Sequence, residues 1–257
     1  MRLYLKYFGI NFRSAMEYKA SFIMTMIGTF MTAFTCFIGI WFLFQRFHHI
    51  QGYTFEQVLL CFSIIMFAFS LSEVIARGFD SFSSIISNGQ FDRIMVRPRG
   101  LVFQVLAAKM EFTRVSKLLQ TLIMLMYAIP RCGVLWTPDK VFVLFFMLVG
   151  ATVMFCGLFV MHAAICFFTT EGIEVFNILT DGSKNFGQYP VSIYGKGMVR
   201  FYTYVVPMAC VQYYPLLYLL DRGPVWYGLL PAAGFLFLIP SYILWRIGVR
   251  HYKSTGS

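Results

Sequence analysis

The chain has 257 residues, of which 59% are hydrophobic and only 12% are charged, and its mean hydropathy is +0.70. A soluble domain carries about 25% charged residues, so this composition excludes a soluble globular protein and predicts an integral membrane protein. The net charge of +10 would suit nucleic-acid binding, but membrane proteins also gain positive charge through their cytoplasmic loops.

The first predicted element is the segment before the first long apolar run, residues 1–20. Leu3, Tyr7 and Ile10 recur at close to the 3.6 residues of a helical turn, while Arg13 falls on another face. A basic amphipathic helix of this kind lies in the headgroup region of the inner leaflet. We therefore expect an N-terminal interfacial helix, with an unstructured basic anchor as the alternative.

Six apolar runs without charged residues follow along the chain. A helix needs about 17–25 apolar residues to cross a bilayer core about 30 Å thick. Five runs are long enough, and the third becomes so if its helix begins earlier, with Arg114 and Lys117 extending to the lipid headgroups. The sequence thus predicts an all-α polytopic membrane protein in a single domain, residues 1–257, with six transmembrane helices. The predicted spans cover residues 21–45, 56–76, 114–132, 141–168, 201–220 and 224–245.

The loops between these spans predict the orientation. With the N-terminus inside, seventeen of the 21 Lys and Arg residues fall in the cytoplasm and only four fall outside. Cytoplasmic loops carry such an excess of positive charge, so both termini are expected in the cytoplasm. The same bias accounts for the net charge without a nucleic-acid partner, and the lipid bilayer is the partner of the apolar surface.

The first long polar insertion covers roughly residues 77–116, and its segment 79–99 contains a short amphipathic helix. Asn88 and Gly89 form a strong turn dipeptide, and Pro98 ends the helix that follows. Three apolar side chains share one face of this helix and three charged side chains lie elsewhere: Phe91, Ile94 and Met95 against Asp92, Arg93 and Arg97. A solvated loop needs no apolar face, so this face is expected to contact a protein partner or, as the alternative, lipid alone.

The second polar insertion, residues 171–200, mixes acids, glycines and aromatic residues. Asp181 and Lys184 stand in an Asp-Gly-Ser-Lys sequence that predicts a flexible turn, and Tyr189 and Pro190 follow it. We expect this insertion to form a second contact with a cytoplasmic partner or a gate at the inner mouth of the membrane domain. A plain connector is the alternative.

The sequence contains no recognisable catalytic or metal-binding pattern: it lacks a phosphate-binding loop, an HExxH motif and cysteines at metal-ligand spacing. His162 stands alone in the fourth span and is expected to be a hydrogen-bonded structural residue. Glu73 is expected at the membrane border. With almost no charge inside the membrane, an ion-coupled transporter is disfavoured, and neither enzyme activity nor a metal site is expected.

Two stretches of the sequence are characteristic of a known family. Residues 89–100 read GQFDRIMVRPRG, and Tyr189-Pro190, Pro207 and Tyr214-Pro215 follow in order. The first resembles the Gly-x-Phe-Asp-x-x-Leu-x-Arg-Pro signature of a poorly characterised bacterial branch of the ABC-2-type export permeases, with Ile94–Met95 in the place of the leucine region. The second resembles the same branch, and the resemblance covers essentially the whole chain.

The resemblance implies a permease subunit in the bacterial cell membrane without an ATPase of its own. Such a subunit pairs with a second, unlike permease and with two copies of a separate ATP-binding cassette ATPase. ATP and Mg bind to that ATPase, so this chain is expected to bind no cofactor. Residues 79–99 would be the coupling helix, with Asp181, Lys184, Tyr189 and Pro190 as a second contact or gate. The docking residues would be Ile86, Gly89, Phe91, Asp92, Arg93, Ile94, Met95, Arg97 and Pro98.

The same resemblance implies that Pro207, Tyr213, Tyr214 and Pro215 form a broken or re-entrant element, an outer gate. The Phe- and Met-rich spans suit an amphiphilic or hydrophobic cargo such as a drug, lipid or peptide, although such residues also pack helices or face lipid. Two other functions stay open: an antimicrobial-resistance or sensing subunit on the same scaffold, and a polytopic membrane enzyme.

Overall fold

A computed structural model describes residues 2–47, 50–109, 111–169 and 172–252 of the chain. The described residues form helices and the connections between them, so the all-α prediction is confirmed.

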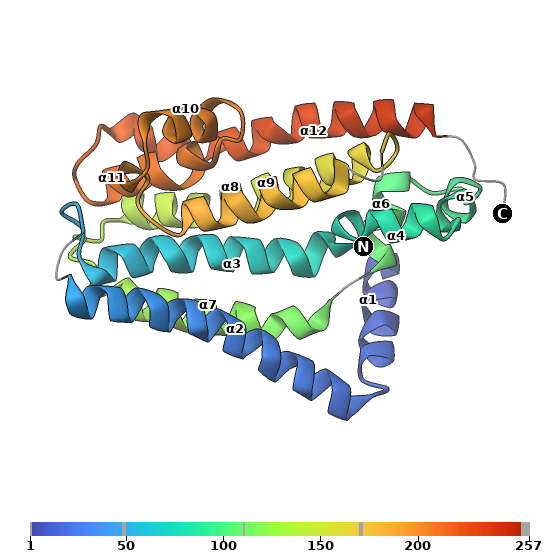
Figure 1. Cartoon of the computed structure of the whole chain (residues 1–257), viewed down its shortest axis with the longest axis horizontal. Helices are drawn as coiled ribbons and strands as arrows, with labels where there is room; N and C mark the ends of the chain where they lie inside the picture. The colour runs from blue at the N-terminus through green and yellow to red at the C-terminus, as the bar shows by residue number, and fades with distance from the viewer. Residues whose placement is uncertain (1, 48–49, 110, 170–171, 253–257) are drawn as a thin grey trace.

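Four helices in the described ranges are long and apolar enough to cross a membrane. They are α2 (Lys19–Arg46), α3 (Phe55–Asp80) with its continuation α4 (Phe82–Ser87), α8 (Pro138–Ile165) and α12 (Ala232–His251). They form where the sequence has its longest apolar runs, because a helix satisfies every backbone polar group without water. Figure 1 shows them side by side in a bundle.

The two ends of this bundle differ. α3 begins at one end, called here the distal end, and finishes at the other, called the termini end because α1 (Arg2–Ala15) and the last turn of α12 lie there (Figure 1). α1 lies across the bundle axis, as an interfacial helix would. Asn11 donates to the carbonyl oxygen of Ala107 at 3.3 Å, and the rings of Phe12 and Phe112 meet edge to face at 5.3 Å between centroids.

The predicted third span is a shorter helix, α7 (Val115–Ala128), which packs along α3. Its 14 residues rise about 21 Å, which is less than a bilayer core of about 30 Å. A 3₁₀ turn, Phe112–Arg114, precedes it. The structure therefore does not confirm the count of six spans.

A helix lies where the sequence predicted a polar loop. α9 (Gly172–Gly187) runs back along α8 and α3 from the termini end towards the distal end (Figure 1). Thr180, Ser183 and Phe186 are buried at helical spacing, so α9 packs one face on the bundle. The prediction of a flexible turn at residues 181–184 is wrong, because these residues lie inside α9.

The predicted fifth span, residues 201–220, is not one helix. α10 (Lys196–Tyr204) ends before Pro207, a π-helical turn (Ala209–Tyr213) follows, and α11 (Tyr214–Leu219) comes next. Proline has no backbone N–H and clashes with the preceding helical turn, which explains the break. These short elements lie towards the distal end (Figure 1).

α12 begins later than the predicted sixth span, because a 3₁₀ turn, Val225–Leu229, lies between Pro224 and Pro231. It then packs closely on α8. A Cβ atom on Gly234 would lie 2.1 Å from the carbonyl oxygen of Gly150. Two glycines thus let the backbones of α8 and α12 approach closely, as small residues do between membrane helices.

The chain between α4 and α7 forms two more short helices, α5 (Gln90–Met95) and α6 (Leu101–Ala108). Gly89 turns the chain between α4 and α5 with a left-handed φ of 62°, the backbone geometry that an Asn-Gly dipeptide favours. Gly78, near the end of α3, lets α6 pass close by, because a Cβ there would lie 1.9 Å from a backbone oxygen of α6.

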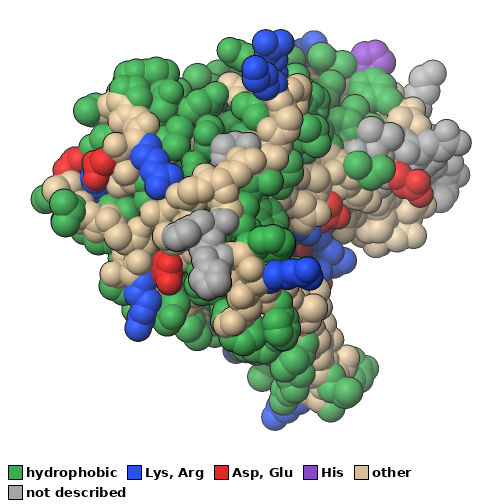
Figure 2. Space-filling view, turned by 60° about the vertical axis from the view of Figure 1, so that its left-hand side comes forward, with side chains coloured by type: hydrophobic (Ala, Val, Ile, Leu, Met, Phe, Trp, Pro, Cys, Tyr) green, Lys and Arg blue, Asp and Glu red, His purple; other side chains and the backbone are tan. Residues whose placement is uncertain are grey.

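Apolar side chains cover much of the face seen in Figure 2. On α2 the buried residues are Ala33, Ile40 and Phe44, whereas side chains such as Ile23 and Met24 are exposed. Such a surface suits lipid or the helices of another membrane protein.

Candidate functional site

The aromatic side chain of the predicted coupling helix, Phe91, packs against other helices of the same chain. Phe91 on α5 is fully buried, and its ring centroid lies 5.3 Å from that of Phe82 and 5.2 Å from that of Phe167. Trp245 on α12 contacts both Phe82 and Phe91. Tyr252, just beyond α12, meets Phe91 at 4.9 Å. We call these five residues the aromatic cluster; it joins α4 and α5 to the ends of α8 and α12.

The prediction that all three apolar side chains of this helix contact a partner or lipid is therefore wrong in part. Phe91 and Ile94 are buried by the chain's own helices, and only Met95 of the three, 40% exposed, faces outward. Periodicity places three side chains on one face, but it does not reveal that α8 and α12 end close enough to cover two of them. Within residues 79–99, the most exposed apolar side chain is that of Val96, which is 82% exposed.

The outward side of the segment is basic. Arg93, Arg97 and Arg99 are all exposed. Asp92 is half-buried, and burial together with this nearby carboxylate raises the pKa of Tyr252. The segment thus offers three guanidinium groups beside an open apolar side chain.

Two hydrogen bonds on the inner side of the segment hold the path of the chain after α5. Gln104 on α6 donates from Nε2 to the carbonyl oxygens of Ile94 at 3.1 Å and Arg99 at 2.9 Å. Ile86 is half-buried on α4, and Pro98 is exposed where the chain leaves α5. Sequence reasoning missed Gln104, because one polar residue in an apolar helix forms no pattern.

A charged cavity of about 520 Å³ opens into the bundle near the termini end, lined by α2, α3, the start of α7, α8 and α9. Its exposed lining residues include Thr32 on α2 and Asn177 and Asp181 on α9. These exposed residues place the mouth of the cavity between α2 and α9.

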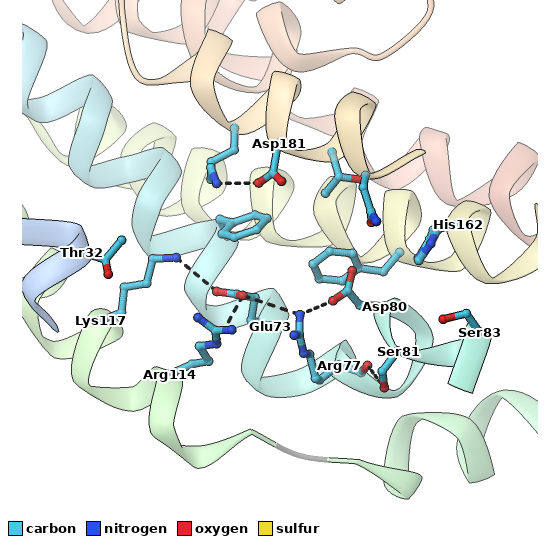
Figure 3. A pocket seen from close by; sticks show the side chains of 15 residues that line it. Thr32, Glu73, Arg77, Asp80, Ser81, Ser83, Arg114, Lys117, His162 and Asp181 are labelled. Carbon is cyan, nitrogen blue, oxygen red and sulfur yellow. Dashed lines mark hydrogen bonds and ion pairs between the residues drawn. The ribbon is translucent and has the colours of Figure 1, made fainter. Parts of the chain in front are cut away.

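Glu73 is the buried centre of this cavity. The residue is 4% exposed, and its carboxylate accepts a hydrogen bond from Lys117 Nζ at 3.3 Å. Arg114 Nε lies 3.5 Å from the carboxylate and Arg77 Nη1 lies 3.8 Å from it, and Figure 3 shows the three cations gathered around it. Glu73 was expected to be interfacial rather than buried, and this is wrong as to burial: the side chain lies inside the protein, where three cations offset the cost of burying its charge.

Arg77 extends these ion pairs to two further acids. It pairs with Asp80 on the same helix, and its Nε lies 2.7 Å from Glu111 Oε2. Arg114 Nε lies 3.4 Å from the same oxygen. The pairs tie the end of α3 to the start of α7.

Sequence reasoning missed this network, although its spacing is visible. On α3 the charges recur at positions i, i+4 and i+7, and before and within α7 they recur at every third residue. Such spacings place charged residues along one helical face. Two facing rows of mixed charge were therefore readable, but the pairing between them was not.

Asp181 and Lys184 enter the same cavity from α9. Lys184 Nζ donates to Asp181 Oδ1 at 2.6 Å. The ammonium groups of Lys184 and Lys117 lie 5.0 and 4.9 Å from the ring centroid of Phe69. Two cations from different helices thus approach one aromatic ring.

His162 on α8 also lines the cavity and is 3% exposed. Neither ring nitrogen meets hydrogen-bond geometry with a described residue, so the structure does not confirm the expected hydrogen-bonded role. A buried polar group without a partner costs free energy. The described residues hold no group of three His, Cys, Asp or Glu side chains placed for a metal ion.

Tyr189 and Pro190 do not lie with Asp181 and Lys184. They follow the far end of α9, where Pro190 is buried and Tyr189 lines a pocket with Phe47, just after α2. The sequence placed these four residues in one insertion, whereas α9 separates them into two sites.

The predicted outer-gate residues gather towards the distal end. The rings of Tyr213 and Tyr214 lie 5.4 Å apart, and Tyr214 meets Tyr227 at 5.1 Å, centroid to centroid. Pro215 is buried in the first turn of α11, and Pro207 is half-buried before the π-helical turn. The result is a broken element held by contacting tyrosine rings.

Comparison with known proteins adds one finding. A family model described as "ABC-2 family transporter protein" matches residues 30–256, which is most of the chain. No curated protein and no solved structure matches the chain significantly.

Proposed function

Because this chain belongs to the ABC-2 family of transporter proteins, we propose that it is the permease subunit of an ATP-binding cassette exporter. Permeases of this family lack an ATPase domain and act with separate ATPase subunits, so ATP hydrolysis belongs to a partner chain. The observation that carries the finer proposal is the basic segment around α5, which is exposed on one side and anchored on the other by the aromatic cluster.

The segment between α3 and α6 acts as the coupling helix. Met95 and Val96 fill an apolar depression on the ATPase in the helix-in-groove mode. Arg93, Arg97 and Arg99 pair with acidic groups around that depression and fix the register. Movement of the ATPases, driven by their bound ATP and Mg, passes through the aromatic cluster to α8 and α12.

The complex contains two copies of the ATPase and a second, unlike permease. The broad exposed apolar surface of α2 supports a partner within the bilayer. Both termini lie in the cytoplasm of a bacterial cell, since the positive charges gather in the same loops as the coupling helix.

The cargo is an amphiphilic or hydrophobic molecule that moves from the termini end to the distal end. Asp181 and Lys184 act at the inner mouth, and the element that holds Pro207, Tyr214 and Pro215 acts as the outer gate. The charged cavity and the ring-lined element at opposite ends of the bundle support this division.

A membrane enzyme is less well supported. The cavity supplies a polar cluster, but the ring of His162 forms no hydrogen bond with a Ser, Thr, Cys or Lys side chain among the described residues. A resistance or sensing subunit would use the same scaffold and ATPase contact, and would differ only in its cargo.

Co-purification with the cognate ATPase tests the coupling role. We expect Arg93→Glu combined with Arg97→Glu to lower the recovered ATPase about tenfold or more, because repulsion replaces charge complementarity. Lys196→Glu with Arg200→Glu is the matched control, since both residues are exposed on α10, away from α5. Full ATPase recovery with the first pair would contradict the proposal.

A further inference from the structure

The acids of the charged cavity are already engaged. Each carboxylate that lines it has a cation from the chain itself: Glu73 has Lys117, Asp80 has Arg77, and Asp181 has Lys184. The negative charge of the cavity is therefore compensated within the protein.

The cations keep spare hydrogen-bond donors. A guanidinium group carries five N–H donors and an ammonium group three. Arg114 donates no side-chain hydrogen bond to another described residue and meets two carboxylates only at 3.4 and 3.5 Å. Lys117 and Lys184 each donate one hydrogen bond within the described chain. The buried ring of His162, unpartnered among the described residues, adds a further polar group that faces the cavity.

These groups surround a space of about 520 Å³. Lys184 lines it from α9, whereas Arg114 and Lys117 lie side by side and His162 lies on the opposite side (Figure 3). Phosphate and carboxylate oxygens satisfy several such donors at once. A cation would instead meet positive charge and acids that are already paired. The cavity therefore favours an oxygen-rich anion.

The surroundings of the cavity favour an anion with an apolar tail. The rings of Phe69 and Phe159 form part of its wall. Its opening lies between α2, whose outer surface is apolar, and α9, where Ile178 is 72% exposed. An alkyl chain can lie along these helices in the bilayer while its headgroup enters the cavity.

We propose that this cavity binds the anionic headgroup of an amphiphile, a phosphate or carboxylate on an acyl or alkyl chain, and that the exporter's cargo belongs to this class. The statement about cargo rests on the proposed function, whereas the binding site does not. Binding is therefore tested without the ATPase.

Isothermal titration calorimetry of the full chain in phosphatidylcholine nanodiscs, corrected with empty nanodiscs, tests the ligand class. The probes are dodecyl phosphate, dodecyltrimethylammonium, dodecyl maltoside and inorganic phosphate. We expect dodecyl phosphate to bind about tenfold or more tightly than the others. Equal affinity for the phosphate and ammonium amphiphiles would overturn the anionic site. Inorganic phosphate binding as tightly as dodecyl phosphate would reveal a free-anion site and overturn the amphiphile.

Two substitutions with opposite expected effects test the location. Lys184 pairs with the exposed Asp181, so replacing either leaves no buried charge unpaired. We expect Lys184→Gln to weaken dodecyl phosphate binding about fivefold, through the loss of a charged hydrogen bond, and Asp181→Asn to strengthen it by freeing Lys184. Lys196→Gln, on exposed α10, is the control and leaves affinity unchanged. Unchanged affinity in both cavity variants would overturn the placement.

Different results would contradict the two proposals. Dodecyl phosphate binding by a chain that never recruits an ATPase would keep the site and overturn the exporter. ATPase recruitment by a chain that binds no dodecyl phosphate would keep the exporter and overturn the anionic site.

Discussion

At the scale of single residues, Glu73 is where the ion pairs of the cavity converge. Its carboxylate is within ion-pair distance of Lys117, Arg114 and Arg77. Removing it leaves three cations facing one another with less compensating charge. We expect Glu73→Ala to lower the free energy of unfolding by about 3 kcal/mol, measured by thermal unfolding of the full chain in detergent.

The matched control is Glu17→Ala, which removes an exposed carboxylate between α1 and α2. Its unfolding midpoint should equal that of the wild type, because exposed charges contribute little. Equal midpoints for the two variants would mean that the Glu73 pairs contribute no net stability.

Individual residues were predictable only where their role is local. The turn at Gly89 follows from the backbone preference of Asn-Gly, and the break near Pro207 follows from the missing proline N–H. The burial of Glu73 and Phe91 could not be predicted, because it depends on helices that are distant in sequence. The sequence shows which residues are charged, but it does not show with which residues their charges pair.

At the scale of elements, α9 is the helix that differs most from the sequence prediction. We expect backbone amides of residues 179–187 to exchange slowly with deuterium, since this part of α9 is hydrogen-bonded and packs on the bundle. Hydrogen-exchange mass spectrometry of the full chain in nanodiscs measures this.

The connection at residues 133–135, between α7 and α8, is the internal reference for fast exchange, because its amides donate no backbone hydrogen bond within the described residues. If residues 179–187 exchanged as fast as this connection, they would form the flexible turn that the Asp-Gly-Ser-Lys sequence first indicates. Ser183→Pro should raise the exchange rate around it, because proline interrupts a helix interior.

Hydropathy was sufficient for α2, α3 and α8, since each is a long apolar run with no competing signal, and it indicated α12 but not where that helix begins. It failed for α9, where polar residues face the charged cavity and a Gly-Ser pair resembles a turn. The spacing of Thr180, Ser183 and Phe186 was nevertheless helical. It failed also for α10 and α11, whose apolar sequence is long enough to span but is divided by prolines.

At the scale of the whole molecule, the distribution of charge predicts orientation. We expect Arg97→Cys to react with a membrane-impermeant maleimide only after cells are permeabilised, whereas Arg222→Cys reacts in intact cells. Both side chains are exposed, and they lie in loops assigned to opposite sides of the membrane. The unsubstituted chain, with its six native cysteines, provides the background. Labelling of both positions in intact cells would contradict this topology.

The aromatic cluster connects the position of α5 to the positions of α8 and α12. It fixes α5 to the ends of α8 and α12, so a shift of that helix pair also changes the surface that α5 presents. Thermodynamic linkage makes this effect reciprocal. If the ATPase prefers one arrangement of the pair, a cargo that stabilises the same arrangement raises the affinity for the ATPase by the same factor. A permease with bound cargo would then hold its ATPase more tightly than an empty one.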